Sequence, residues 1–274
     1  MELARPESVA DAVEALGNGA VAFGGGTELV PLLNSRIVRA DTLVELRRAV
    51  PKGIHGTTIG AGTTLGELEV DPEIPEALRE ACRLSASPQL RATGTIGGNL
   101  LQATRCWYWR LKFPCRLHGG DRCHAREGEH REHAIFANDF CASAHPSDPA
   151  AALLALGTTV RTDRRELPIA DLYRLPTEDN RATTTLAKDE LILELEVPKA
   201  DASVYVKAMD RRRWAFALVA VAAARFGDEV RLGLAGVAPI PWSDVSGATP
   251  LPGTAYKATI LDALVRRARQ AVAA

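Results

Sequence analysis

The sequence predicts an α+β protein of three parts, with two small α/β units at 1–53 and 54–165 and a C-terminal α+β domain at 166–274. Three observations lead to this division. Up to residue 53, helical and strand-like segments alternate around a glycine turn, and from residue 57 a second strand enters another glycine turn. Beyond residue 166 strand-like segments prevail, and the chain closes with an amphipathic helical pattern.

The first unit begins with a helix whose N-cap is Ser8, because a serine hydroxyl accepts a hydrogen bond from the free amides of a first helical turn. Apolar side chains recur on one face of this helix up to Leu16, and Gly17 and Gly19 then end it. The elements expected next are a strand at 21–23, a helix at 28–33 and a strand at 42–46.

The second unit also combines strands and helices around a glycine turn, apart from one anomalous segment. Its expected elements are a strand at 58–62, helices at 65–68, 75–84 and 149–156, and a strand at 158–162. Residues 104–145 are instead rich in Cys, His, Arg and Trp and have little hydrophobic periodicity. This segment therefore reads as a loop that something other than a hydrophobic core organises.

The C-terminal domain contains the longest apolar stretch of the chain, from Trp214 to Ala224. It is shorter than the roughly 18 residues of a membrane span, so it is read as a buried element. The elements expected here are strands at 191–197, 203–208 and 229–236 and helices at 216–225 and 259–272.

Composition excludes several classes of partner. The formal net charge of −1 provides no broad positive field for nucleic acid or for an anionic membrane. The first ten residues mix acids and bases and lack the apolar stretch of a secretory signal, which favours a cytoplasmic location. In a reducing compartment, cysteines indicate metal, cluster or redox chemistry more often than disulfides.

Four of the five cysteines lie in the anomalous loop, and Cys82 lies in the helix expected at 75–84. The four that the loop contains are Cys106, Cys115, Cys123 and Cys141. Four thiolates suffice for an iron–sulfur cluster or for a structural zinc ion, and the long spacings leave cluster, zinc and unligated thiols open. Zinc sites usually show a short C-x2–4-C knuckle, which is missing here, although histidines lie nearby. Basic side chains are interleaved and would offset the charge of a cluster: Arg105, Arg110, Arg116, Arg122 and Arg126.

Two glycine turns are candidate ligand sites. Phe23-Gly24-Gly25-Gly26-Thr27-Glu28 follows a strand and opens a helix, so its backbone amides suit an anion such as phosphate. It is neither a dinucleotide-binding fingerprint nor a P-loop. Thr95-Ile96-Gly97-Gly98-Asn99 is a second glycine turn whose backbone a ligand could approach closely. Asp148 stands at a helix start, where it is either a cap or a ligand. A serine hydrolase is disfavoured because no Gly-x-Ser-x-Gly elbow occurs.

Four segments together resemble the FAD-binding medium subunit of the xanthine dehydrogenase, or molybdenum hydroxylase, family. They are the stretches at 23–29, 90–100, 119–125 and 145–153, and the resemblance spans nearly the whole chain. The cysteine loop is similar to that of the aldehyde oxidoreductase branch, whose medium subunit carries a [4Fe–4S] cluster besides FAD. The resemblance implies two FAD-binding subdomains of the vanillyl-alcohol-oxidase (PCMH) type and a C-terminal α+β domain of the CO-dehydrogenase flavoprotein type.

The resemblance also implies roles for individual residues. Those expected to bind FAD are Phe23, Gly24, Gly25, Gly26, Thr27, Glu28, Leu29, Thr95, Gly98, Asn99, Thr104, Asp148, Leu191, Ile192 and Lys207. Within this set Asp148 would contact the ribityl hydroxyls, and Leu191 or Ile192 and Lys207 would approach the flavin ring. The four loop cysteines would hold the [4Fe–4S] cluster, and no catalytic acid, base or nucleophile is expected on this chain.

The resulting hypothesis is an electron-transfer subunit, because flavins accept two electrons and release them singly whereas clusters carry one. A molybdenum-cofactor large subunit and a [2Fe–2S] small subunit would supply the electrons, and the acceptor would be oxygen, a quinone, a ferredoxin or NAD. Two alternatives remain at this point. One is a stand-alone FAD-dependent oxidoreductase with a structural cluster, and the other is a zinc-stabilised binding module without redox function.

Overall fold

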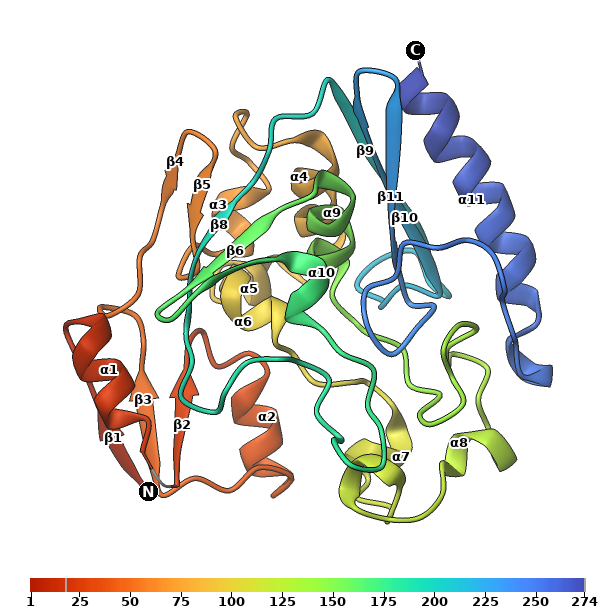
Figure 1. The fold of residues 1–274 in the computed structure, drawn as a ribbon. Coiled ribbons are helices and arrows are strands. Elements are labelled where there is room, and N and C mark those ends of the chain that lie inside the picture. The colour runs from red at the N-terminus through yellow and green to blue at the C-terminus, as the bar shows by residue number, and fades with distance from the viewer. Residues whose placement is uncertain (18, 274) are drawn as a thin grey trace.

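The computed structural model describes residues 1–17 and 19–273, which form three β-sheets with helices packed around them (Figure 1). The first sheet has the order β1-β3-β2 and consists of Glu2–Ala4, Thr42–Glu45 and Ala20–Phe23, all parallel. Helix α1 (Val9–Ala15) begins as expected, since Ser8 Oγ accepts a hydrogen bond from the Asp11 amide at 3.1 Å. Helix α2 (Leu29–Asn34) follows the glycine turn.

The second sheet is antiparallel and has the order β4-β5-β8-β6-β7. Its strands are β4 (Ile54–His55), β5 (Thr58–Gly60), β6 (Thr159–Thr162), β7 (Glu166–Pro168) and β8 (Ile192–Glu196). Five helices belong to this region, namely α3 (Leu65–Leu68), α4 (Glu76–Leu84), α5 (Pro88–Arg91), α6 (Ile96–Leu100) and α9 (Asp148–Leu156), and α10 (Ile169–Leu172) follows β7. The sheet thus continues past residue 165 to β8, while the expected division into domains stays a prediction.

The third sheet is an antiparallel meander, β9-β10-β11, of Ala202–Ala208, Val219–Phe226 and Glu229–Ala235. Helix α11 (Tyr256–Ala273) packs on one face, while α4 and α9 pack on the other (Figure 1). A one-turn helix, η2 (Pro252–Thr254), leads into α11. Among the described residues no helix is both long and apolar enough to span a membrane.

The helix expected at 216–225 is wrong, because this segment forms β10, the central strand of the third sheet. Val219, Val221 and Ala223 lie in the core beneath α11. Their neighbours Ala220, Ala222 and Ala224 point the other way, into the large core that contains α4 and α9. Since both faces of the strand are buried, the usual polar and apolar alternation that reveals a strand is absent.

The cysteine-rich loop, residues 104–145, has only single turns of regular structure. They are α7 (Trp107–Arg110), η1 (Arg116–His118) and α8 (His124–Glu127). Figure 1 shows α7 and α8 in the yellow-green part of the chain, beyond one end of the third sheet. The loop nevertheless returns to a core, since Ile135 and Phe136 are buried against the residues that α11 covers.

Candidate functional site

The two glycine turns pack against each other. A Cβ on Gly25 would lie 1.9 Å from the carbonyl oxygen of Thr93, so the backbones touch here and only glycine fits. A Cβ on Gly24 and one on Gly98 would each lie 3.0 Å from Thr95 Oγ1, and one on Gly94 would lie 3.2 Å from Thr27 Oγ1. Segments about 70 residues apart in the chain therefore make one continuous backbone surface.

Hydrogen bonds join the second glycine turn to helix α9. Thr95 Oγ1 accepts from the Gly98 amide at 3.2 Å and so caps α6. Asn99 Oδ1 accepts from Ser147 Oγ at 2.6 Å, and Ser147 Oγ itself accepts from the Ala150 amide at 3.0 Å. Ser147 is thus the N-cap of α9, and the expected cap Asp148 is its first residue.

Asp148 lies at the centre of a buried polar network. Its Oδ2 is 2.6 Å from Lys207 Nζ, with side-chain exposures of 3% and 1% respectively. Its Oδ1 accepts from Tyr205 Oη at 2.5 Å, and Ser85 Oγ donates to Oδ2 at 3.2 Å. Lys207 Nζ also donates to the carbonyl of Leu84 at 3.0 Å. Asp148 and Lys207, each predicted separately as an FAD contact, therefore form one ion pair. Tyr205 lies two residues before Lys207 on β9 and was not predicted.

Glu28 links the first glycine turn to the cysteine loop. Its carboxylate lies 2.7 Å from Arg105 Nη2 and 2.5 Å from Arg110 Nη2. Arg110 Nε also donates to the carbonyl of Thr104 at 2.8 Å, while Thr104 Oγ1 accepts from the Cys106 amide at 3.1 Å. These two arginines were expected to offset cluster charge, but they are engaged by Glu28, and Arg105 also lies over the Phe216 ring.

Leu191 and Ile192 are both in cores. Leu191 is 4% exposed and packs with the small core of the first unit, and Ile192, 5% exposed, belongs to the large core. At the glycine turn, Phe23 covers the backbone of Gly26, where a Cβ would lie 2.7 Å from the ring. Leu29 begins α2 immediately after Glu28.

The four loop cysteines line one small cavity. Three of them immediately precede a helical turn: Cys106 precedes α7, Cys115 precedes η1 and Cys123 precedes α8. Of the three, Cys106 has amides of its following turn, those of Tyr108 and Trp109, near its sulfur. Cys141 Sγ lies 3.3 Å from Ser143 Oγ, and Cys82 lies apart in the large core.

Burial favours the protonated thiol at two of these cysteines, Cys106 and Cys141. Burial raises the pKa of Cys106 to about 11, against an opposing influence of the Tyr108 and Trp109 amides, and it raises the pKa of Cys141 to about 12. Within 1–17 and 19–273, no group of three or more Cys, His, Asp or Glu side chains converges as a single metal ion would require. A closed zinc site needs its four sulfurs about 2.3 Å from one point. Four thiols around one cavity are the donor type that both structural zinc and iron–sulfur clusters use.

Arg181 and Lys257 also hold the loop and were missed because their partners are backbone carbonyls, which leave no signal in a sequence. Arg181 Nη1 donates to the carbonyls of Arg116 and Gly120 at 2.5 and 2.9 Å. Lys257 on α11 is fully buried and donates to three carbonyls. His133 is buried as well, with Nε2 3.2 Å from Cys106 Sγ, and burial lowers its pKa to about 4.

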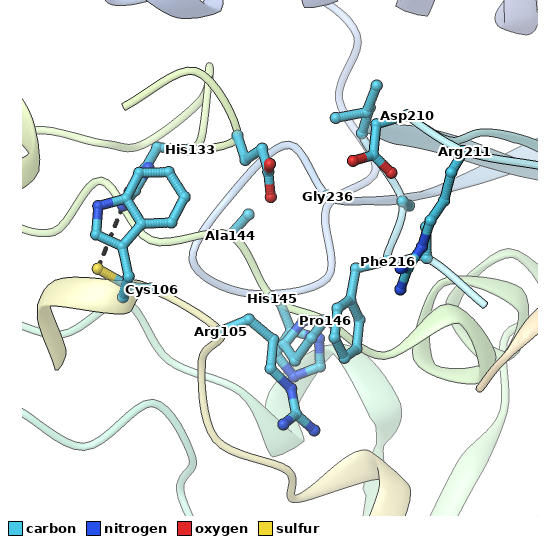
Figure 2. Close-up of a pocket in the computed structure, with 15 residues that line it drawn as sticks. Arg105, Cys106, His133, Ala144, His145, Pro146, Asp210, Arg211, Phe216 and Gly236 are labelled. Carbon is cyan, nitrogen blue, oxygen red and sulfur yellow. Dashed lines mark hydrogen bonds between the residues drawn. The ribbon is translucent and has the colours of Figure 1, made fainter. Parts of the chain in front are cut away.

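A cavity of about 160 Å³ lies between this loop and the C-terminal domain. Figure 2 shows Cys106 and His133 at one side of it and Asp210 and Arg211 at the other. His145, just before α9, also lines it, and burial lowers the pKa of His145 to about 3, so this ring is neutral. The cavity therefore lies between Cys106 and the residues that lead into α9.

Comparison with known proteins identifies the family. A family model described as "FAD binding domain in molybdopterin dehydrogenase" matches residues 1–200. The aldehyde oxidoreductase FAD-binding subunit PaoB of Escherichia coli (strain K12) is 34% identical over 244 residues, which cover 82% of this chain and 76% of that subunit. The chain belongs to this family. It is therefore an FAD-binding oxidoreductase chain of the molybdenum hydroxylase type, as the resemblance predicted.

Further matches agree with this family and with its fold. The carbon monoxide dehydrogenase medium chain of Afipia carboxidovorans is 39% identical over 107 residues, 35% of this chain and 37% of that one. A reconstituted CO dehydrogenase from Oligotropha carboxidovorans superposes with a TM-score of 0.70 at 22% identity, covering 99% of this chain and 97% of that chain. Quinoline 2-oxidoreductase from Pseudomonas putida 86 gives 0.70 at 18% identity, covering 99% and 96%. The two structures confirm the predicted α+β fold.

Proposed function

We propose that the two facing glycine turns hold the pyrophosphate and ribityl chain of FAD. The backbone surface formed by Gly24, Gly25 and Gly98 supports this role, because amides without side chains can approach phosphate oxygens closely. The paired Asp148 and Lys207 are the charged groups proposed to contact the ribityl chain and the flavin ring, and because they are 3% and 1% exposed, this contact would require their network to open toward the cofactor. Leu191 and Ile192 are buried in cores, so their proposed contact with the ring would require their cores to open toward it.

We further propose that Cys106, Cys115, Cys123 and Cys141 bind a [4Fe–4S] cluster. One observation carries this proposal: four cysteines spread over residues 106–141 line a single cavity, and three of them directly precede a single helical turn. When bound, the cluster would carry single electrons to or from the flavin. The protein would bury the sulfurs, supply amides from the turn after Cys106 and tie the loop to the flavin turn through Glu28.

The function that fits this arrangement is an electron relay within a molybdenum-dependent oxidoreductase. Relatives are named as FAD-binding or medium subunits of aldehyde oxidoreductase and carbon monoxide dehydrogenase. By analogy we propose a molybdenum-cofactor large subunit and a [2Fe–2S] small subunit as partners, an aldehyde or N-heterocycle as substrate of the complex, and an external electron acceptor. Residues of this chain would bind and orient cofactors instead of acting as acid, base or nucleophile.

The test is an anaerobic visible spectrum of the purified chain with analysis of iron, sulfide and flavin. We expect FAD and roughly four irons per chain, as a [4Fe–4S] centre requires. Cys115→Ser is expected to lose iron and to keep FAD, whereas Cys82→Ser, a matched change at a buried cysteine outside the loop, should keep both. Stoichiometric zinc, or iron that survives Cys115→Ser but not Cys82→Ser, would refute the cluster proposal.

A further inference from the structure

His133 is the one histidine of the loop whose ring lies within hydrogen-bonding distance of a cysteine sulfur among the described residues. Its Nε2 lies 3.2 Å from Sγ of Cys106 (Figure 2), and the side chain is buried. Neither the FAD site nor the set of four thiols uses it. It lies outside the four-cysteine set yet next to one of its members.

The contacts of His133 hold its ring in one orientation. The Trp107 ring meets it edge-on, with centroids 4.7 Å apart and an interplanar angle of 85°. Its backbone is held from the C-terminal domain, because Lys257 Nζ donates to the carbonyls of Glu132, His133 and Gly236 at 2.9, 2.8 and 2.8 Å. These bonds use all three donors of the ammonium group. The backbone that carries the imidazole is therefore fixed from α11, and Trp107 packs against the ring.

The direction of the hydrogen bond follows from the chemistry of the sulfur. A thiolate bound to iron has no proton and can only accept, so Nε2 must carry the proton and donate. Hydrogen bonds to the sulfurs of an iron–sulfur centre are among the influences that set its reduction potential. Reduction adds one electron and hence negative charge to the thiolate-bound centre, which strengthens a bond donated to sulfur.

We propose that His133 donates a hydrogen bond to the Cys106 thiolate and thereby raises the reduction potential of the cluster. This rests on the proposed cluster. In the reversible reaction one electron enters, from the reduced flavin or from dithionite in a titration, while the proton stays on Nε2 and no bond is broken. His133 acts through Cys106, and helix α11 contributes by fixing the backbone that carries it.

The experiment is an EPR-monitored dithionite titration of the purified chain, with iron content measured for each sample. His133→Leu removes the donor at similar size, and His133→Gln places an amide donor near the same point. In His133→Leu we expect the ratio of reduced to oxidised cluster at a fixed potential to fall on the order of tenfold, about 59 mV for one electron. His133→Gln should recover most of this shift.

The control is His118→Leu, since His118 is exposed in the same loop and its Nε2 lies 2.9 Å from the carbonyl of Trp109 and not near a sulfur. An unchanged potential in iron-loaded His133→Leu, or an equal shift in His118→Leu, would overturn the inference alone. Wild-type protein without iron would instead overturn the cluster proposal and this inference with it.

If His133→Leu does not retain iron, pulsed EPR of reduced wild-type protein labelled with 15N-histidine tests the hydrogen bond between His133 and Cys106 instead. A nitrogen coupling that disappears in His133→Gln supports the hydrogen bond. The absence of such a coupling in the wild-type spectrum rejects it.

Discussion

At the scale of single residues, the least replaceable polar group is the carboxylate of Asp148. Lys207 and Tyr205 both bind it in a region closed to water, with Asp148 and Lys207 side chains 3% and 1% exposed. A buried ion pair contributes little over an apolar pair of the same size, but breaking it leaves an uncompensated charge. Loss of one member of the Asp148–Lys207 pair should therefore lower the stability more than loss of both members.

Asp148→Asn is expected to lower the free energy of unfolding by about 3 kcal/mol, because the Lys207 ammonium stays buried with only the Leu84 carbonyl as a charge-stabilising partner. Lys207→Met added to Asp148→Asn should restore much of the loss. Tyr205→Phe removes one hydrogen bond and should cost about 1 kcal/mol. Urea unfolding followed by tryptophan fluorescence measures the wild type, these variants and the Lys207→Met single variant. Costs that simply add in the double variant would show that the pair is not coupled.

At the scale of elements, the sequence located the local features better than the contacts between them. Ser8 as a cap, the strand at the first glycine turn and the final helix were predictable because their signals are local. Strand β10 was mistaken for a helix, since a strand buried on both faces has no alternation. The pairing of Glu28 with Arg105 and Arg110 joins segments about 80 residues apart, and nothing local encodes it.

The contact between the two glycine turns gives a sharp prediction at this scale. In Gly25→Ala the new Cβ would overlap the Thr93 carbonyl, so one of the turns must move. Such a backbone shift costs about 1–3 kcal/mol, which would weaken FAD binding by roughly 5- to 150-fold. Fluorescence titration of flavin-free protein with FAD measures the effect.

Gly17→Ala is the matched control, because its Cβ would meet only the Glu14 carbonyl at 4.0 Å. Equal FAD affinity in the two variants would mean that the turns do not form the flavin site. A loss confined to Gly25→Ala would instead support the proposed pyrophosphate position.

At the scale of the whole molecule, the three sheets do not share one core. The large core joins the second sheet to one face of β10, so these parts are packed as one body. The first sheet has its own small core of Ala12, Leu16, Val44, Ala49 and Leu191. It is also tied to the rest through the glycine turn, the ion pairs of Glu28 and hydrogen bonds between residues 51–53 and 60–63. A unit with few buried apolar contacts opens at lower free energy than the rest of a protein.

Without FAD, amides of β2 and β3 are therefore expected to exchange with solvent faster than those of β10, which is buried on both faces. FAD that bridges Gly24–Gly26 and Thr95–Asn99 binds only the closed arrangement, so saturating FAD should slow exchange in β2 and β3. Exchange in β10 should change little, because opening of the first unit leaves its two cores intact. Mass spectrometry of peptides from these strands, with and without FAD, makes the comparison. Equal protection by FAD in β10 and β2 would mean that the chain opens as a single unit, and the predicted boundary near residue 53 would then have no energetic meaning.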